Sequence, residues 1–201
     1  MMNMITEAEW QEWNEAQQAA TIAGLVGNDF KAAVNILNRY LEDRAPEDLR
    51  GEVIAFRGTL YQEHGELERA KNDYLEAWHL AAEDYARFEL EDTLAEISKK
   101  LDDAQEADRW YSTALATGAT DPRAAGGGFL LRFLQFRGQH GLSDHERQLA
   151  ETMIIHGWQL LQVEGEPVLH DLEEAAGRLL EAQQGPFSAH RPPTPGVDPE
   201  S

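Results

Sequence analysis

Apolar residues return along most of this chain at steps of three and four positions, as between Leu67, Ala70, Tyr74 and Ala77. This spacing gives a helix one apolar stripe, because an α-helix completes a turn every 3.6 residues. The alternation of apolar and polar residues that marks a half-buried strand is almost absent. The sequence therefore predicts an almost wholly α-helical protein.

Breaks in this pattern, mostly at glycine, proline, asparagine and aspartate, divide the chain into expected helices. Thr6 with Glu9, and Ser143 with Glu146, have the spacing of capping boxes, which predicts helix starts at these points. The helices are expected at residues 6–26, 29–43, 47–64, 67–82, 84–101, 103–117, 127–139, 144–162 and 166–184.

Sets of small and larger residues recur at an interval of 37 positions. The three sets are Ala33–Leu37–Tyr40, Ala70–Tyr74–Ala77 and Ala107–Tyr111–Ala114. Each is preceded, 12 positions earlier, by a small residue: Thr21, Gly58 or Ala95. The expected hinges recur too, at Asn28, Gly65 and Asp102, and these residue types tolerate a left-handed backbone or cap the next helix. A helix pair cannot bury its apolar face alone, so repeated pairs are expected to stack into a solenoid.

The middle set resembles the tetratricopeptide repeat. The family's order of a small residue, an aromatic residue, a glycine before the turn, and then alanine, aromatic and alanine stands here as Gly58, Tyr61, Gly65, Ala70, Tyr74 and Ala77. The departures are Ser98 and Asp102 in the third repeat and Thr21, Gly24 and Tyr40 in the first. The interval of 37 also exceeds the family's usual length of about 34 residues, so a related α-solenoid class stays open.

The resemblance implies an all-α, right-handed α-solenoid of stacked antiparallel helix pairs. Residues 1–118 would form three repeats, and 119–128, with its proline and three glycines, a loop. Residues 129–184 would pack on the solenoid as a degenerate fourth pair and a capping helix. The tail, 185–201, is rich in proline and small polar residues and is expected to be disordered.

The formal net charge is −20, and most of the excess lies in residues 1–121. Such a surface repels phosphate backbones and anionic lipids, which argues against nucleic-acid or membrane partners and favours a basic one. The alternative is that the charge only maintains solubility. The chain has no cysteine, and its N-terminus lacks the basic flank and apolar run of a signal peptide, so we expect a soluble cytoplasmic protein.

Candidate chemistry is sparse. The segment His140–Glu146 gathers two histidines and two acids that could hold a metal, but a polar turn with a capping box is the favoured interpretation. His156 has an apolar setting typical of a core histidine. The glycines near residue 126 lack the lysine and serine or threonine of a phosphate loop. We expect no cofactor, no metal and no enzyme activity.

The resemblance implies binding in a concave groove lined by the first helix of each pair. The groove residues carried over by spacing are Glu52, Ala55, Thr59, Gln62 and Glu63 in the second repeat, Glu89, Asp92, Glu96, Lys99 and Lys100 in the third, and Glu15, Gln18, Ile22 and Leu25 in the first. This groove is mainly acidic, which disfavours a peptide carboxyl terminus and fits a basic protein or peptide. Alternatively, these are ordinary exposed helix positions.

A second candidate surface is the apolar segment FLLRFLQF, with Phe129, Phe133 and Phe136. Packing against the end of the solenoid is favoured over a hydrophobic docking or dimer face. The sequence as a whole predicts a non-enzymatic protein-interaction module, for instance an acidic inhibitor of the immunity-protein kind, by analogy alone. The competing hypotheses are a helical metal-binding protein or enzyme using His140–Glu146, and a self-assembling subunit that forms a homo-oligomer.

Overall fold

The computed structural model describes residues 5–126, 128–138, 141–164 and 173–179. Every regular element in these ranges is helical, and they contain no β-strand, which confirms the predicted all-α fold. The chain divides into two compact units, Met1–Ala124 and Ala125–Ser201. The dividing point lies within the predicted loop 119–128, where the short 3-10 helix η3 spans Pro122–Gly126.

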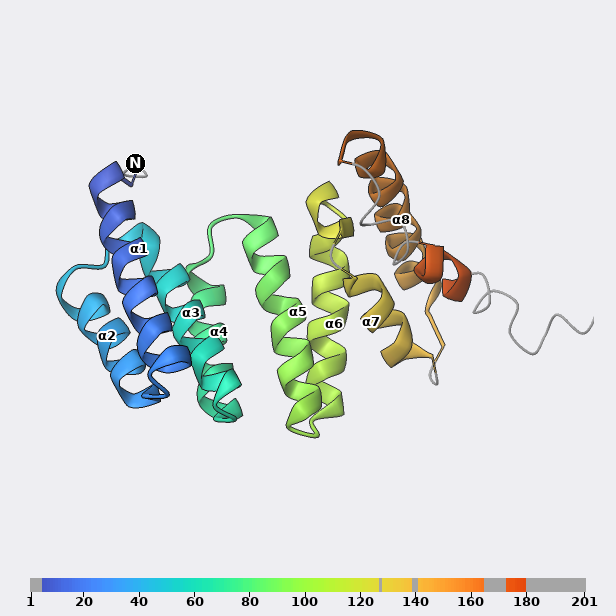
Figure 1. Cartoon of the computed structure of the whole chain (residues 1–201). Helices are drawn as coiled ribbons and strands as arrows, with labels where there is room; N and C mark the ends of the chain where they lie inside the picture. The colour runs from blue at the N-terminus through green and yellow to red at the C-terminus, as the bar shows by residue number, and fades with distance from the viewer. Residues whose placement is uncertain (1–4, 127, 139–140, 165–172, 180–201) are drawn as a thin grey trace, which may run out of the picture. The chain divides into compact units, whose positions relative to one another are not determined.

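The first unit consists of three helix hairpins (Figure 1). Consecutive helices pack against each other along this unit, and α1 also contacts α3. Each pair therefore buries its apolar face against the next, as the repeat interval predicts. The helices are α1 (Glu7–Thr21), α2 (Phe30–Asp43), α3 (Arg50–Glu63), α4 (Leu67–Leu80), α5 (Asp84–Lys100) and α6 (Ala104–Gly118).

The three repeated sets form the centre of this packing. Their nine residues are all buried: Ala33, Leu37, Tyr40, Ala70, Tyr74, Ala77, Ala107, Tyr111 and Ala114. Gly58 lies where α3 meets α4, and a methyl group there would lie 3.2 Å from Tyr74 Cε1 and 3.3 Å from Asp73 Cβ. The small residue thus allows the close helix approach that its position in the repeat predicts.

The hinges between paired helices share one backbone conformation. Asn28, Gly65 and Asp102 have φ angles of 51°, 81° and 59°, in the left-handed region that the sequence predicts for them. In two hinges the next residue caps the following helix, since Asp29 and Asp103 each accept a backbone N–H at 2.9 Å. A left-handed residue therefore reverses the chain between the paired helices of all three repeats, and an aspartate caps the next helix in two of them.

Two expected helices are less regular than predicted. Residues 6–26 are not one α-helix, because α1 passes into the π-helix η1 (Ile22–Val26), where the Gly27 N–H donates to the Ile22 carbonyl at 2.8 Å. The expected helix 47–64 opens with the 3-10 turn η2 (Glu47–Leu49). Pro46 precedes it with its fixed φ, and its carbonyl accepts the Leu49 N–H at 3.0 Å.

The described part of the second unit contains α7 (Phe129–Arg137) and α8 (Asp144–Glu164). Ser143 caps α8, with the reciprocal bonds Ser143 N to Glu146 Oε2 at 2.9 Å and Glu146 N to Ser143 Oγ at 3.2 Å. Of the expected capping helix 166–184, residues 173–179 are described and helical. The predicted tail, 185–201, lies outside the described residues.

Candidate functional site

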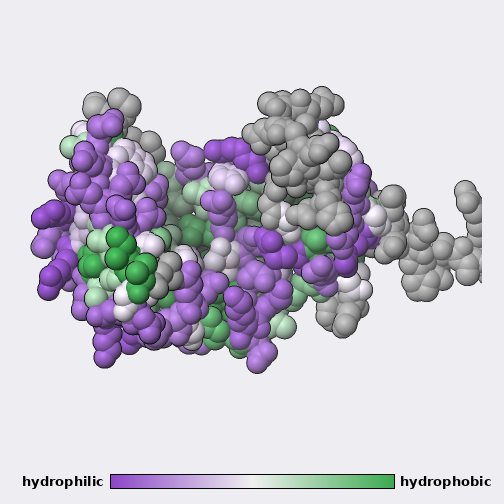
Figure 2. Space-filling view, in the orientation of Figure 1, coloured by the Kyte–Doolittle hydropathy of each residue, from purple (hydrophilic) through white to green (hydrophobic). Residues whose placement is uncertain are grey.

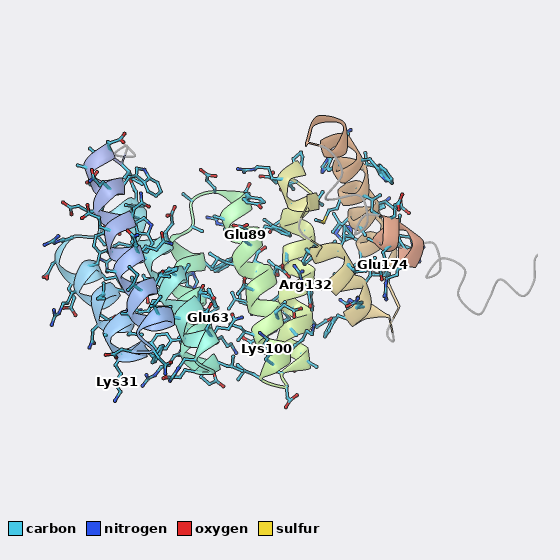
Figure 3. The ribbon with its side chains drawn as sticks, in the orientation of Figure 1. Lys31, Glu63, Glu89, Lys100, Arg132 and Glu174 are labelled. Atoms are coloured by element: carbon cyan, nitrogen blue, oxygen red, sulfur yellow. The ribbon has the colours of Figure 1, made fainter. Side chains whose placement is uncertain are left out.

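The predicted groove residues of α3 and α5 share one face of each helix. At about 100° per residue they span an arc of roughly 100°. Glu52, Glu63, Glu89 and Lys99 are exposed, whereas Thr59, Gln62, Asp92 and Glu96 are half-buried. We call this surface, together with the equivalent positions of α1, the first-helix face; Glu63, Glu89 and Lys100 are labelled in Figure 3. That a partner binds to it stays a prediction.

A buried tyrosine supports this face in the second repeat. The Tyr74 hydroxyl lies 3.0 Å from Thr59 Oγ1 and donates to Gln62 Oε1 at 3.4 Å. Burial raises the pKa of Tyr74, so the hydroxyl keeps its proton and remains a donor. Two predicted groove residues are therefore fixed from beneath by the second helix of their own repeat.

The third repeat places the same three positions in contact, but with charged residues. Tyr111, 37 positions after Tyr74, donates to the Glu96 carboxylate, and Lys99 Nζ donates to the Tyr111 hydroxyl at 3.2 Å. Lys99 also pairs with Glu96 at 2.9 Å. Since Glu96 and Lys99 neutralise each other, the net negative charge of this face comes from other carboxylates.

Those carboxylates include one glutamate in each repeat. Glu15, Glu52 and Glu89 stand 37 positions apart on α1, α3 and α5, and all three are exposed. We call them the glutamate row. Desolvation raises the pKa of Glu52, and a hydrogen bond from Trp13 opposes that rise. The row nonetheless presents three acidic groups at one repeat position.

At the C-terminal end of its first helix, the first repeat has apolar residues where the other two repeats have polar ones. Ile22, equivalent to Thr59 and Glu96, is 52% exposed, and Val26 is 80% exposed. Figure 2 shows the resulting apolar patch over the C-terminal part of α1 and η1, surrounded by hydrophilic residues. Val26 is absent from the groove residues predicted by spacing, although the interval of 37 would have found it as the counterpart of Glu63 and Lys100.

The structure buries two of the three phenylalanines predicted to form the second surface, FLLRFLQF. Phe129 and Phe133 are buried and their rings stack, with centroids 6.1 Å apart. Burial leaves neither ring accessible for docking, and packing of this segment against the end of the solenoid stays a prediction. Phe136 is half-buried, and docking there stays a prediction.

The His140–Glu146 segment offers little support for a metal site. Glu146 belongs to the capping box and pairs with Arg137 at 2.5 Å, while Asp144 pairs with Arg147 at 3.3 Å. His140 lies outside the described residues. Within the described ranges, no group of three or more histidine, aspartate and glutamate side chains is arranged to hold a metal ion.

Sequence reasoning missed a polar network on the other side of α3. Arg57 donates to both Asp73 carboxylate oxygens at 2.7 and 2.8 Å, and to Asn38 Oδ1 at 2.7 Å. The bond to Asp73 raises the pKa of Arg57. Beside this network is a cavity of about 220 Å³, lined by Asn38, Leu41, Glu42, Arg50, Ile54, Arg57 and Glu76. The interval of 37 gave no signal for the network, because only one repeat contains it.

The helical fold has counterparts among solved structures. BtubC (BKLC) from P. vanneervenii superposes with a TM-score of 0.58 at 19% sequence identity, covering 94% of this chain and 84% of BtubC. A Podosopora anserina putative kinesin light chain with nearly identical TPR-like repeats gives a TM-score of 0.43 at 12% identity, covering 90% of this chain and 97% of that one. No protein-family model matches the chain, and no curated protein sequence does.

Fold and repeat interval together define the class: the chain is an all-α helical-repeat protein with a tetratricopeptide-like α-solenoid architecture. None of the helices in the described ranges combines the length and hydropathy needed to cross a bilayer.

Proposed function

We propose that this chain is a non-enzymatic protein-interaction module whose first-helix face forms an acidic groove for a basic protein or peptide. The observation that carries the proposal is the glutamate row, in which Glu15, Glu52 and Glu89 are exposed at one position of three successive repeats. Stacked repeats turn one helix position into a line of side chains, so one extended ligand can contact all three.

The spacing of the row suits an extended basic segment. Packed helices lie about 8–10 Å apart, and an extended chain advances about 3.3 Å per residue. A segment with lysine or arginine at every third residue, a step of about 10 Å, would bring a basic side chain near each of the three glutamates. Because these carboxylates are exposed, attraction should accelerate association and weaken with salt. An acidic inhibitor of a basic protein is one form of this function, supported by the net charge of −20.

The test compares two triple variants with the same change in charge. Glu15→Gln/Glu52→Gln/Glu89→Gln removes the row, and Glu42→Gln/Glu68→Gln/Glu76→Gln removes three exposed glutamates from α2 and α4. Binding of a synthetic peptide with lysine at every third residue is measured by calorimetry at about 50 mM and 500 mM salt. We expect the first variant to lose at least tenfold in affinity and the control to lose less than threefold.

Equal losses in the two variants would show that net charge alone attracts the peptide, and the proposed groove would be wrong. Capture from native lysate, eluted with salt, then identifies natural partners. Recovery of this chain alone would instead support a homo-oligomer.

A further inference from the structure

The apolar patch of Ile22 and Val26 differs from every other part of the first-helix face. At equivalent positions the second repeat has Thr59 and Glu63, and the third has Glu96 and Lys100. Val26 is 80% exposed and Ile22 is 52% exposed, and they are the two most accessible large apolar residues in the described part of the first unit. These two positions thus change from apolar at α1, through a hydroxyl and a carboxylate at α3, to two charged groups at α5.

Local backbone structure presents these two residues together. Both belong to η1, the π-helical end of the first helix, and they are four positions apart, so they share one side of it. Contiguous exposed apolar residues rimmed by polar ones mark interaction surfaces more often than isolated ones do.

The charges around the patch specify what can cover it. Residues 7–26 contain no lysine or arginine, and their four glutamates lie at residues 7–15, on the side of the patch that faces the start of α1. On α3, the position equivalent to Val26 is the exposed Glu63. A second copy of this chain, with a net charge of −20, would bring like charges to the same place. A basic ligand that also carries apolar side chains satisfies both the patch and its surroundings.

From these observations we infer that the Ile22–Val26 patch binds an apolar anchor in the basic partner, and so sets the direction in which the partner lies. The basic residues of the partner contact Glu89 at the α5 end, and its apolar residues contact Ile22 and Val26 at the α1 end. This inference rests on the proposed function of the first-helix face, and it adds the chemistry and polarity of the ligand.

Geometry sets a minimum distance between the two parts of the ligand. From α1 to α5 is at least two helix spacings, about 16–20 Å. Ile22 and Val26 also stand 7 and 11 residues beyond Glu15, the α1 equivalent of Glu89, which is about 10–17 Å along the helix axis. An extended peptide needs at least about six residues to cover this diagonal, so a ligand should have two basic residues and two apolar residues separated by at least that number.

The experiment uses the full chain and three synthetic peptides, measured by fluorescence anisotropy. The first has two lysines, six serine or glycine residues and two leucines; the second has serines in place of the leucines; the third has a spacer of two. We expect the first to bind about tenfold more tightly than either of the others, because burial of even one leucine contributes at least that factor.

Two variants locate the effect. Ile22→Thr/Val26→Thr keeps the branched shape and adds no charge, and Ile155→Thr is a control at an isoleucine that is 56% exposed on α8. The double variant should abolish the advantage of the leucine peptide and leave binding of the serine peptide unchanged. The control should change neither.

Other outcomes overturn the inference in distinguishable ways. If leucine and serine peptides bind equally, or the double variant retains the difference, the patch is not the anchor site, although the acidic face can still be correct. If no peptide binds, and removal of the glutamate row changes nothing, the proposed function itself fails. If sedimentation shows a dimer that only the double variant loses, a second copy covers the patch.

Discussion

The second and third repeats share one helical framework, but each has a polar residue pair where the other has an apolar one. Arg57 and Asp73 form an ion pair between α3 and α4 with little exposure, whereas their counterparts 37 positions on, Leu94 and Trp110, belong to an apolar cluster. The contact between neighbouring repeats shows the reverse exchange. Leu41 and Ile54 pack in one apolar core, and their counterparts Trp78 and Glu91 are joined by a hydrogen bond of 2.9 Å.

This comparison separates the residues that build the repeat from those that fill it. Small residues and left-handed hinges recur at the interval of 37, because helix approach and chain reversal require them in every repeat. The residues between helices need only complement one another, so a buried pair can be ionic in one repeat and apolar in the next. At the position of Leu41, which lines the cavity, the next repeat has the larger Trp78.

Breaking the Arg57–Asp73 ion pair should have the largest effect on the free energy of unfolding. Asp73→Ala leaves Arg57 mostly buried without its carboxylate, and we expect unfolding by urea to show a loss of about 3 kcal/mol. Arg57→Leu/Asp73→Ala, which brings in the leucine of the third repeat, should recover part of that loss because no unpaired charge remains. A double variant less stable than Asp73→Ala would contradict this account.

Removing the buried carboxylate of Glu91 should stabilise the protein by about 1–2 kcal/mol at pH 7. Glu91 is 2% exposed, and burial raises its pKa, opposed mainly by the Trp78 hydrogen bond. A carboxyl whose folded pKa is raised favours the folded state at low pH, and this contribution is lost as pH rises through the folded pKa. The free energy of unfolding of Glu91→Gln, relative to that of wild type, should therefore increase as the pH rises from about 4. If this stability difference does not change with pH, titration of Glu91 is not its cause.

Adding a methyl group at Gly58 should lower the free energy of unfolding by about 1 kcal/mol, although alanine is the better helix former. The added Cβ would press on Tyr74 and Asp73, whereas the third repeat already accommodates Ala95 at this position, fully buried. Thermal unfolding of Gly58→Ala measures the effect. An unchanged or raised Tm would mean that α3 and α4 can separate freely at this point.

The smallest difference in stability is expected between variants of two equivalent helix N-caps, Asp103 and Glu66. Asp103→Ala removes the side chain that accepts the Glu106 N–H, and should cost about 1 kcal/mol. Glu66→Ala, at the equivalent position of the second repeat, removes no capping bond and should cost clearly less. Chemical denaturation of both variants provides the comparison, and equal losses would show that the cap is not the cause.

Much of the first-helix face could be placed from the sequence, but not its internal contacts. The interval of 37 located Glu52, Glu89 and the positions between them, because side chains on one helix face follow from helix geometry alone. It did not reveal that Glu96, which pairs with Lys99, also accepts a hydrogen bond from Tyr111, since the tyrosine comes from another helix. Nor did it show that Phe129 and Phe133 are buried, because an apolar segment has the same pattern whether it packs or docks.

The sequence by itself determined the features that depend on neighbours along the chain. Helix periodicity, the capping boxes and the left-handed hinges at Asn28, Gly65 and Asp102 all arise from interactions within a few residues. Only the tertiary structure decided that Ile54 and Glu91 are both buried at one repeat position, and that Val26 is exposed. Burial is set by which side chains from other helices cover a residue, and local sequence does not contain that information.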